Sequence, residues 1–393
     1  MYTLGIDVSK HQHTVLVMDS AGQVVRRAFS IRNDRAGFEQ LLAALAQLPE
    51  PVQIGLEATG HDWLSLYEAL TRANYPVIVF NPLQVHAYQR TGLRKCKTDA
   101  VDAFWIADFT RISQRAPAQE HTEIVLQLRE LTRFRFGLTA QIGEIKQKIL
   151  NILERVFPEY EQLFSDVFIQ SSRQLLQHAV TPQELADFDL QELSDLLQRS
   201  SRGRFGPDKA LSLQQAARTS IGVSFLADAV RLTMRQLLEQ LTLLETQRRE
   251  LEAAIADLVT RLPQHLTSVV GVGPVIAATL LAEIGDVRRF ESSAKLVAYA
   301  GINATQHQSG QFTASETHMS KRGSPYLRQA LWQAAIVAAQ HDPELRTYLE
   351  RRVAEGKPRN VALGAVCRKL LARIYVVLRD NRPYEVRTTP CRP

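Results

Sequence analysis

Leu4-Gly-Ile-Asp7, Thr14-Val-Leu-Val-Met18 and Val24-Val-Arg-Arg-Ala-Phe-Ser-Ile31 open the chain as three successive apolar runs. Runs of this length, rich in β-branched residues and bounded by polar residues and glycine, predict three strands in a meander. Strand and helix patterns then alternate over residues 37–46 (helix), 52–57 (strand), 64–73 (helix) and 77–80 (strand). Strands that alternate with helices of about ten residues predict an α/β layer with a mixed sheet.

Two long amphipathic helices are predicted beyond residue 119, where the strand signal stops. In the first, apolar residues recur at steps of three and four from Leu131 to Val156. In the second, a strict alternation of four and three runs from Val230 to Leu262, and only Arg248 interrupts its apolar seam. Such a seam predicts a coiled coil, formed as an antiparallel hairpin within one chain or between two chains.

These patterns divide the chain into four parts. An α/β domain is expected over residues 1–118, followed by a helical and coiled-coil region over 119–262 that contains a helical insertion with a loop at 200–206. A mainly helical part follows over 263–385. The tail, 386–393, is rich in Arg, Pro and Thr and is predicted to be disordered.

The composition sets limits on partners and compartment. Lys and Arg (47) exceed Asp and Glu (41), and the formal net charge of +6 moderately favours a polyanionic partner. Cys96, Cys367 and Cys391 are too scattered for a disulfide framework or a zinc site, so a reducing cytoplasm is expected. The chain opens directly on a strand pattern, and its most apolar stretch, 267–282, is shorter than the ~20 residues that span a bilayer. Neither a signal peptide nor a membrane segment is expected.

Four carboxylates are the strongest candidates for catalysis. Asp7 and Glu57 each end a predicted strand, and acids at strand ends lie at the rim of a sheet, where α/β folds place their sites. Asp99 and Asp102 are three residues apart at the start of a predicted helix, so they share one helical face. Four such oxygen donors suit one or two Mg²⁺ ions, which can stabilise both oxygens of a phosphodiester exchange. Taken singly, each acid could instead serve turn formation or the helix dipole.

Basic residues and glycines are candidates for contacts with a nucleic-acid backbone. Arg94, Lys95 and Lys97 precede the Asp99 helix, where a solvated basic face is the alternative reading. Gly271 and Gly273 lie in Val269-Val-Gly-Val-Gly-Pro274, before a predicted helix. Exposed amides at that helix start could hold a phosphate, as in helix-hairpin-helix modules, or the segment could be a plain turn.

Ser309 is the candidate nucleophile. It lies in a polar loop beside a glycine, with the cations of Lys321, Arg322 and Arg328 near in sequence. A serine hydroxyl that attacks phosphorus needs activation, and nearby cations stabilise the developing charge. By spacing alone this assignment is weak, and three other loop serines compete with it: Ser315, Ser320 and Ser324.

Taken in order, these motifs resemble the DEDD transposases of bacterial insertion sequences, the insertion-sequence 110 family, which includes the Piv/MooV invertases. The motifs that carry the resemblance are Gly5-Ile-Asp-Val-Ser-Lys10, Glu57-Ala-Thr-Gly60, Asn81-Pro82, Lys97-Thr-Asp-Ala-Val-Asp-Ala103, Gly271-Val-Gly-Pro274, Ala298-Tyr-Ala-Gly-Ile302, Gln308-Ser-Gly310 and Met319-Ser-Lys-Arg-Gly323. The long helical middle, about 160–225, is similar to the 1111-like subgroup.

The resemblance implies a RuvC-like (ribonuclease-H-like) α/β domain that carries a Mg²⁺-binding tetrad of Asp7, Glu57, Asp99 and Asp102. It also implies a C-terminal transposase domain in which Ser309 is the nucleophile, in an active site shared between subunits of a dimer or tetramer. Members of the family excise and insert an element with the help of a bridge RNA that pairs with target and donor DNA. The protein would then bind the RNA and DNA backbones, and base pairing would provide the sequence specificity. This fits the absence of a recognisable helix-turn-helix or zinc finger from the sequence.

Three other functions remain as alternatives. An actin-like ATPase or sugar kinase also opens on a Gly-Ile-Asp strand, but it needs a second glycine-rich phosphate loop that this sequence lacks. A Holliday-junction resolvase would use the metal site alone and would not need Ser309. A non-catalytic nucleic-acid-binding protein would not need the intact tetrad.

Overall fold

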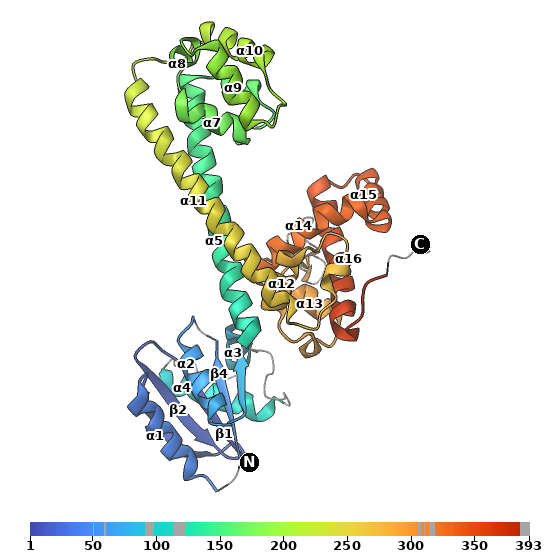
Figure 1. Cartoon of the computed structure of the whole chain (residues 1–393). Coiled ribbons are helices and arrows are strands. Elements are labelled where there is room, and N and C mark those ends of the chain that lie inside the picture. Colours follow the sequence, from blue (N-terminus) through green and yellow to red (C-terminus); the bar gives the residue numbers. More distant parts are fainter. Residues whose placement is uncertain are drawn as a thin grey trace. The chain divides into compact units, whose positions relative to one another are not determined.

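The computed structural model describes residues 1–49, 51–58, 60–90, 98–113, 123–304, 308–309, 312–313 and 319–385. The chain divides into two compact units, Met1–His121 and Thr122–Pro393 (Figure 1). The first unit holds the predicted α/β layer, and the second is mainly helical, as predicted.

The first unit is built on a five-stranded mixed sheet of order β3-β2-β1-β4-β5. Its first three strands form an antiparallel meander, and β4 and β5 run parallel to β1. The strands span Tyr2–Asp7 (β1), Gln12–Met18 (β2), Val24–Arg32 (β3), Val52–Glu57 (β4) and Val77–Phe80 (β5). The helices of this unit are α1 (Arg35–Ala46), α2 (Trp63–Arg72), α3 (Pro82–Gln89) and α4 (Asp99–Ile112). All five predicted strands are present, as are the helices predicted over 37–46, over 64–73 and from Asp99 onward.

Helix α4 approaches the centre of the sheet closely because two paired positions beneath it are glycine. A Cβ atom on Gly5 would lie 2.2 Å from the carbonyl oxygen of Ala103, and one on Gly55 would lie 1.9 Å from Oγ1 of Thr110. Gly5 and Gly55 are opposite each other in β1 and β4. The missing side chains therefore let the helix lie directly on the two strands that end in Asp7 and Glu57.

Replacing Gly5 with alanine is expected to destabilise the first unit by at least about 1–3 kcal/mol, because the added methyl group meets helix backbone, which cannot rotate away. Urea unfolding followed by tryptophan fluorescence, to which Trp63 and Trp105 contribute, measures this loss. Gly143→Ala is the control, because a Cβ there meets nothing within 4 Å. Equal unfolding free energies for G5A and the unmodified protein would contradict the packing argument.

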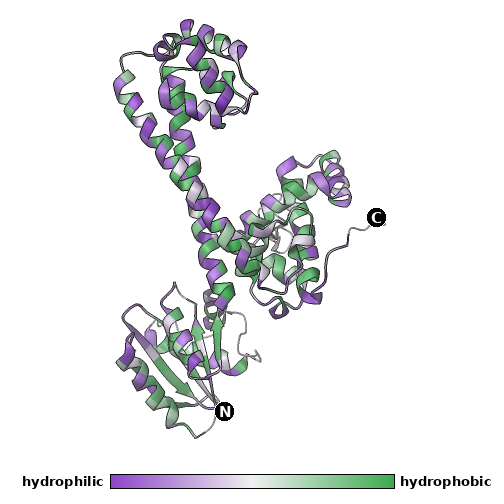
Figure 2. Cartoon of the chain, viewed as in Figure 1, coloured by the Kyte–Doolittle hydropathy of each residue, from purple (hydrophilic) through white to green (hydrophobic). Residues whose placement is uncertain are grey.

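The second unit contains the two long helices as an antiparallel pair within the chain: α5 (Glu123–Val156) and α11 (Ala227–Thr260). Leu128, near the start of α5, packs with Leu258 near the end of α11, whereas Ile149 shares a cluster with Val230. Hydrophobic and hydrophilic residues alternate along both helices (Figure 2). The sequence left open whether these helices pair within or between chains, and here they pair within one.

The helical middle forms a small module at one end of this pair. Its helices are α6 (Tyr160–Leu163), α7 (Gln170–His178), α8 (Pro182–Ala186), α9 (Leu190–Ser200) and α10 (Pro207–Arg218). The predicted loop lies between α9 and α10. The fully buried Tyr160 is satisfied by Ser172, whose Oγ lies 3.0 Å from the phenol oxygen.

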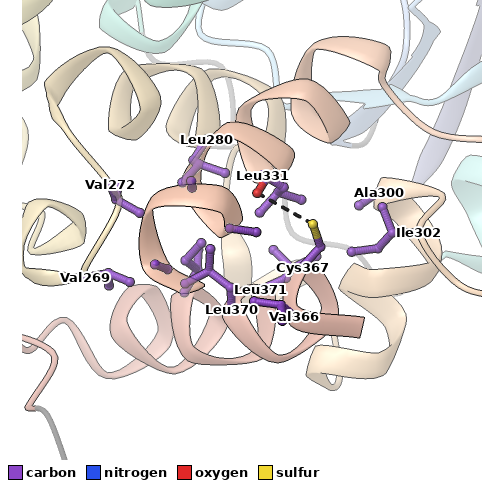
Figure 3. Packing of buried hydrophobic residues seen from close by; sticks show 14 of the residues in the cluster. Val269, Val272, Leu280, Ala300, Ile302, Leu331, Val366, Cys367, Leu370 and Leu371 are labelled. Carbon is purple, nitrogen blue, oxygen red and sulfur yellow. Dashed lines mark hydrogen bonds between the residues drawn. The ribbon is translucent and has the colours of Figure 1, made fainter. Parts of the chain in front are cut away.

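The C-terminal part of this unit surrounds a separate hydrophobic core (Figure 3). It consists of the 3₁₀ turns η2 (Leu266–Ser268) and η3 (Val287–Arg289), the helices α12 (Pro274–Ile284), α13 (Ser293–Ala300), α14 (Pro325–His341), α15 (Pro343–Ala354) and α16 (Arg359–Asp380), and two short strands, β6 (Gln308–Ser309) and β7 (Phe312–Thr313). Cys367 is buried in this core, and its burial raises the pKa of the thiol to about 12. No helix in the described part of the chain is long and apolar enough to cross a membrane.

Candidate active site

Asp7 and Glu57 end neighbouring parallel strands at the same level. Ile6 of β1 is opposite Leu56 of β4, so the two acids follow side by side. Side chains alternate between the faces of a strand, which places each acid on the same face as the glycine two residues before it. Because α4 covers those glycines, Asp7 and Glu57 both lie on the face covered by α4, and both are half-buried.

The direction of α4 brings its first turn to the same edge. Arg111, near the end of the helix, lies against Gly22, where a Cβ would be 3.3 Å from the guanidinium. Gly22 belongs to the turn between β2 and β3, beside the start of β1, because Met18 is opposite Thr3. The helix therefore runs antiparallel to β1 and begins near the strand ends.

The first turn of α4 carries the other two acids. Thr98 caps the helix by accepting a hydrogen bond from the amide of Val101. Asp99 is exposed and Asp102 is half-buried. The four predicted carboxylates thus share one edge and one face of the sheet.

Gln89 holds Asp102 in place. Its Nε2 donates a hydrogen bond of 2.9 Å to Oδ1 of Asp102. The end of α3 is fixed against α4 by the next contact, in which the Tyr88 hydroxyl donates to Oδ2 of Asp108 at 2.5 Å. Burial and the Asp108 carboxylate raise the pKa of Tyr88 to about 12. Sequence reasoning missed Gln89, because a single glutamine in a helix carries no signal.

The donor set fits a divalent cation in its chemistry, since carboxylate oxygens are the ligands that Mg²⁺ uses in proteins. Among the residues that the structure describes, however, no group of three or more His, Cys, Asp or Glu side chains lies close enough to hold a metal ion. The tetrad shares an edge but is not drawn together to coordination distance. Magnesium binding therefore remains a prediction.

His13 supports the turn after Asp7 from the other face of the sheet. Thr14 is opposite Asp7, so the preceding residue lies on the opposite face. His13 is buried, and its Nδ1 accepts a hydrogen bond of 3.3 Å from the amide of Ser9. Burial lowers the pKa of His13, which keeps the ring neutral and able to accept this bond. The sequence analysis did not single out this residue.

The two candidate glycines of the second unit differ in their surroundings. Gly271 has a φ of 88°, and a Cβ there would lie 2.3 Å from the carbonyl oxygen of Ala334 in α14, so it serves close packing. Gly273 is exposed and precedes Pro274 at the start of α12, with nothing within 4 Å of its Cβ position. Of the two, only Gly273 leaves the helix start open for a phosphate.

Ser309 lies in a short β-hairpin. Its strand β6 pairs antiparallel with β7, and Ser309 is opposite Phe312. We call the paired segments 303–304, 308–309, 312–313 and 319–320 the serine hairpin. Its two roots meet where Ala304 pairs with Met319 and where the amide of Ser320 donates to the carbonyl of Asn303 at 3.0 Å.

Two of the competing serines have structural roles. The hydroxyl of Ser320 lies 2.6 Å from Oδ1 of Asn303, and Ser324 caps α14 by accepting from the amide of Leu327. Ser315 lies outside the described residues.

The predicted cationic residues divide into two groups. Lys321 and Arg322 are exposed next to the second root of the serine hairpin. Arg328 is half-buried, and its Nη1 donates to the carbonyl of Gly323 at 2.5 Å, so it holds this root. Burial lowers the pKa of Arg328. The other predicted cations, Arg94, Lys95 and Lys97, lie outside the described residues.

Both units match known proteins. Residues 4–158 match a DEDD family described as transposase, and residues 263–350 match one described as "Transposase IS116/IS110/IS902 family". Over 298 residues the chain is 30% identical to the "Insertion element IS110 uncharacterized 43.6 kDa protein" of Streptomyces coelicolor. This match covers 75% of the present chain and 73% of the Streptomyces protein. The chain belongs to the IS110 family of transposases.

Other relatives of this IS110-family chain match along nearly its whole length. It is 24% identical over 388 residues to the pilin gene-inverting protein of Moraxella bovis, with 98% of each chain covered. It is also 24% identical over 398 residues to the transposase for insertion sequence element IS1111A of Coxiella burnetii, covering 97% of this chain and 90% of that one. The predicted family and enzyme class, a DNA transposase or recombinase, are confirmed.

Proposed function

We propose that this IS110-family transposase excises and inserts an insertion sequence, using a Mg²⁺-dependent carboxylate site and the Ser309 hydroxyl. The observation that carries the proposal is the placement of the acids. Asp7 and Glu57 end paired strands on the face covered by α4, and Asp99 and Asp102 occupy the first turn of that helix. Turn formation or a helix dipole explains each acid alone, but neither explains why all four share one edge.

The architecture of the first unit supports a RuvC-like fold. A three-stranded meander is followed by two strands parallel to β1, and α4 crosses the centre of the sheet. The two long helices α5 and α11 supply the proposed coiled coil. Their pairing within one chain leaves the subunits of a dimer or tetramer free to share an active site through other surfaces.

The four carboxylates would hold Mg²⁺, and Gln89 would orient Asp102 toward it. When bound, the ion neutralises charge on a scissile phosphate and stabilises the attacking and leaving oxygens. The Ser309 hydroxyl would form the bond to phosphorus, and the leaving 3′ or 5′ oxygen would take the proton that the hydroxyl loses. Lys321 and Arg322, exposed at the second root of the serine hairpin, would stabilise the negative charge on the phosphate.

Charge along the chain supports a nucleic-acid partner for the C-terminal part. Residues 263–393 contain 18 Lys or Arg against 10 Asp or Glu, whereas residues 1–262 contain 29 against 31. The whole positive excess therefore lies in the part that carries Ser309, Lys321 and Arg322. An excess of this kind favours backbone contacts with DNA and with a bridge RNA, which would supply the sequence specificity.

Cleavage of labelled element-end DNA by the purified protein tests this function. With Mg²⁺ and RNA transcribed from the non-coding region that flanks the element, we expect strand cleavage at the element ends. Leaving out the RNA or adding a chelator is expected to reduce cleavage to background, because pairing directs the protein and the ion stabilises the exchange. Equal cleavage without RNA would contradict RNA guidance, and equal cleavage in chelator would contradict the metal site.

A further inference from the structure

We propose that Arg133 of α5 and Glu283 of α12 are positioning residues that fix both roots of the serine hairpin. The proposal rests on the proposed role of Ser309 for its effect on the reaction. Its structural basis is an ion pair between the exposed side chain of Arg133 and the buried carboxylate of Glu283, which are 150 residues apart in the sequence. Together these two residues contact one aromatic residue at each root. All of these residues belong to the second unit.

The ion pair has a specific geometry. Glu283 is only 3% exposed although it is charged. The guanidinium of Arg133 binds both of its oxygens, Nε to Oε1 at 2.8 Å and Nη2 to Oε2 at 3.1 Å. A two-pronged bond between planar groups fixes orientation as well as distance. Leaving the buried carboxylate without its partner would lower the stability of the fold. The ion pair therefore holds α12 against α5 in one arrangement.

A second arginine strengthens the same contact. Arg129, one turn earlier on α5, donates from Nε and Nη2 to the carbonyl of Ala282 at 2.9 and 2.7 Å. This carbonyl belongs to the last turn of α12, where the helix itself supplies no partner. Two arginines of α5 therefore bind the end of α12, one at the Glu283 side chain and the other at the backbone carbonyl of Ala282.

The ion pair reaches the first root of the hairpin through Tyr299. The hydroxyl of Tyr299 donates to the backbone carbonyl of Glu283 at 3.2 Å. Tyr299 is the second-last residue of α13, and Gly301 then turns the chain into the first root with a φ of 68°.

Tyr326 links the same pair to the second root. Its ring centroid lies 4.9 Å from the guanidinium carbon of Arg133, a cation–π distance. Tyr326 is the second residue of α14, which begins directly after the second root. Arg133 thus contacts Tyr326, beside the second root, directly. It reaches Tyr299, beside the first root, through Glu283.

The two roots are packed tightly enough to transmit a displacement. A Cβ on Gly301 would lie 2.6 Å from the amide nitrogen of Gly323. The amide of Lys321 donates to the carbonyl of Gly301 at 2.9 Å. A shift of α13 or α14 therefore displaces both roots of the serine hairpin.

The Arg173–Glu245 pair provides a matched control. It is also two-pronged, through Nη1 and Nη2 of Arg173 at 2.6 and 2.9 Å, and both of its side chains are half-buried in the second unit. It joins α7 to α11 in the helical middle, where the cluster of buried residues includes neither Tyr299 nor Tyr326.

The experiment compares Arg133→Gln with Arg173→Gln in the full chain. Hydrogen exchange at the amides of Ser320 and Lys321 reports on the roots, and the rate of protein–DNA adduct formation at saturating DNA reports on the reaction. R133Q is expected to speed exchange at both amides and to slow adduct formation about tenfold to a hundredfold, because small misplacements have effects of this size. Its affinity for DNA should stay within about twofold, since no DNA-binding group is removed. R173Q should match the unmodified protein in amide exchange, in the rate of adduct formation and in affinity for DNA.

A second set of variants separates positioning from loss of stability. In R133Q the buried Glu283 lacks its partner, so the double variant with Glu283→Gln removes that uncompensated charge and should fold stably while still forming the adduct slowly. Tyr326→Phe, which keeps the ring face, should behave like the unmodified protein.

Equal exchange and equal adduct rates in R133Q and R173Q would overturn the proposal. If the unmodified protein forms no adduct, the role of Ser309 fails, and the exchange comparison alone still decides whether Arg133 fixes the roots.

Discussion

Replacing Asp7 with asparagine is expected to abolish DNA strand cleavage, with a loss of at least about a thousandfold. Asparagine keeps the shape of the side chain but removes the charge that attracts Mg²⁺. Because Asp7 lies at the same level as Glu57 and beside the first turn of α4, Glu57→Gln and Asp102→Asn should show the same loss. The measurement is cleavage of labelled element-end DNA at saturating Mg²⁺.

Asp19 offers a control at the opposite edge of the same sheet. Its carboxylate accepts hydrogen bonds from the amides of Ala21 and Gln23 and so serves the turn between β2 and β3. Asp19→Asn should therefore cleave at the normal rate. If Asp99→Asn and Asp102→Asn both recombine normally, the carboxylate site is not the catalytic centre.

Ser309→Ala is expected to remove all covalent protein–DNA adduct, because alanine offers no oxygen to attack phosphorus. DNA binding should be unchanged, since the cations at the hairpin root remain. Gel separation under denaturing conditions, with labelled DNA, detects the adduct directly.

The neighbouring serines are controls for Ser309→Ala. Ser320→Ala and Ser324→Ala should both keep the adduct, because these hydroxyls bond within the protein. Loss of the Ser324 cap should cost about 1 kcal/mol of stability. An adduct that persists in S309A and vanishes in S320A would move the nucleophile to Ser320.

Much of the first unit was predictable because its signals are local. Strand runs ending in Asp7 and Glu57 stand out against the polar segments around them, and the helix that begins at Asp99 carries its own cap, Thr98. The sequence placed Asp7 and Glu57 at strand ends, where they converge only if the two strands are neighbours, and the parallel pairing of β1 with β4 supplies that condition. The local pattern did not contain the direction of α4, which is fixed by contacts with distant segments such as that of Arg111 with Gly22.

The contacts that fix the site were not predictable, because each joins residues without a shared local pattern. Gln89 reaches Asp102 from the helix before it, and His13 binds the amide of Ser9 from the other face of the sheet. Arg133 and Glu283 belong to helices that the sequence does not relate. The α5–α11 pairing was ambiguous for a different reason: an apolar seam has the same period whether its partner lies in the same chain or in another.

The most direct test of the central claim is the search for a covalent adduct between this protein and element-end DNA, in the presence of Mg²⁺ and the flanking RNA. The account predicts an adduct with the unmodified protein, none with S309A and none with D7N. Free cleaved ends in both the unmodified protein and S309A, without any adduct, would contradict it and indicate a nuclease that uses the carboxylates alone.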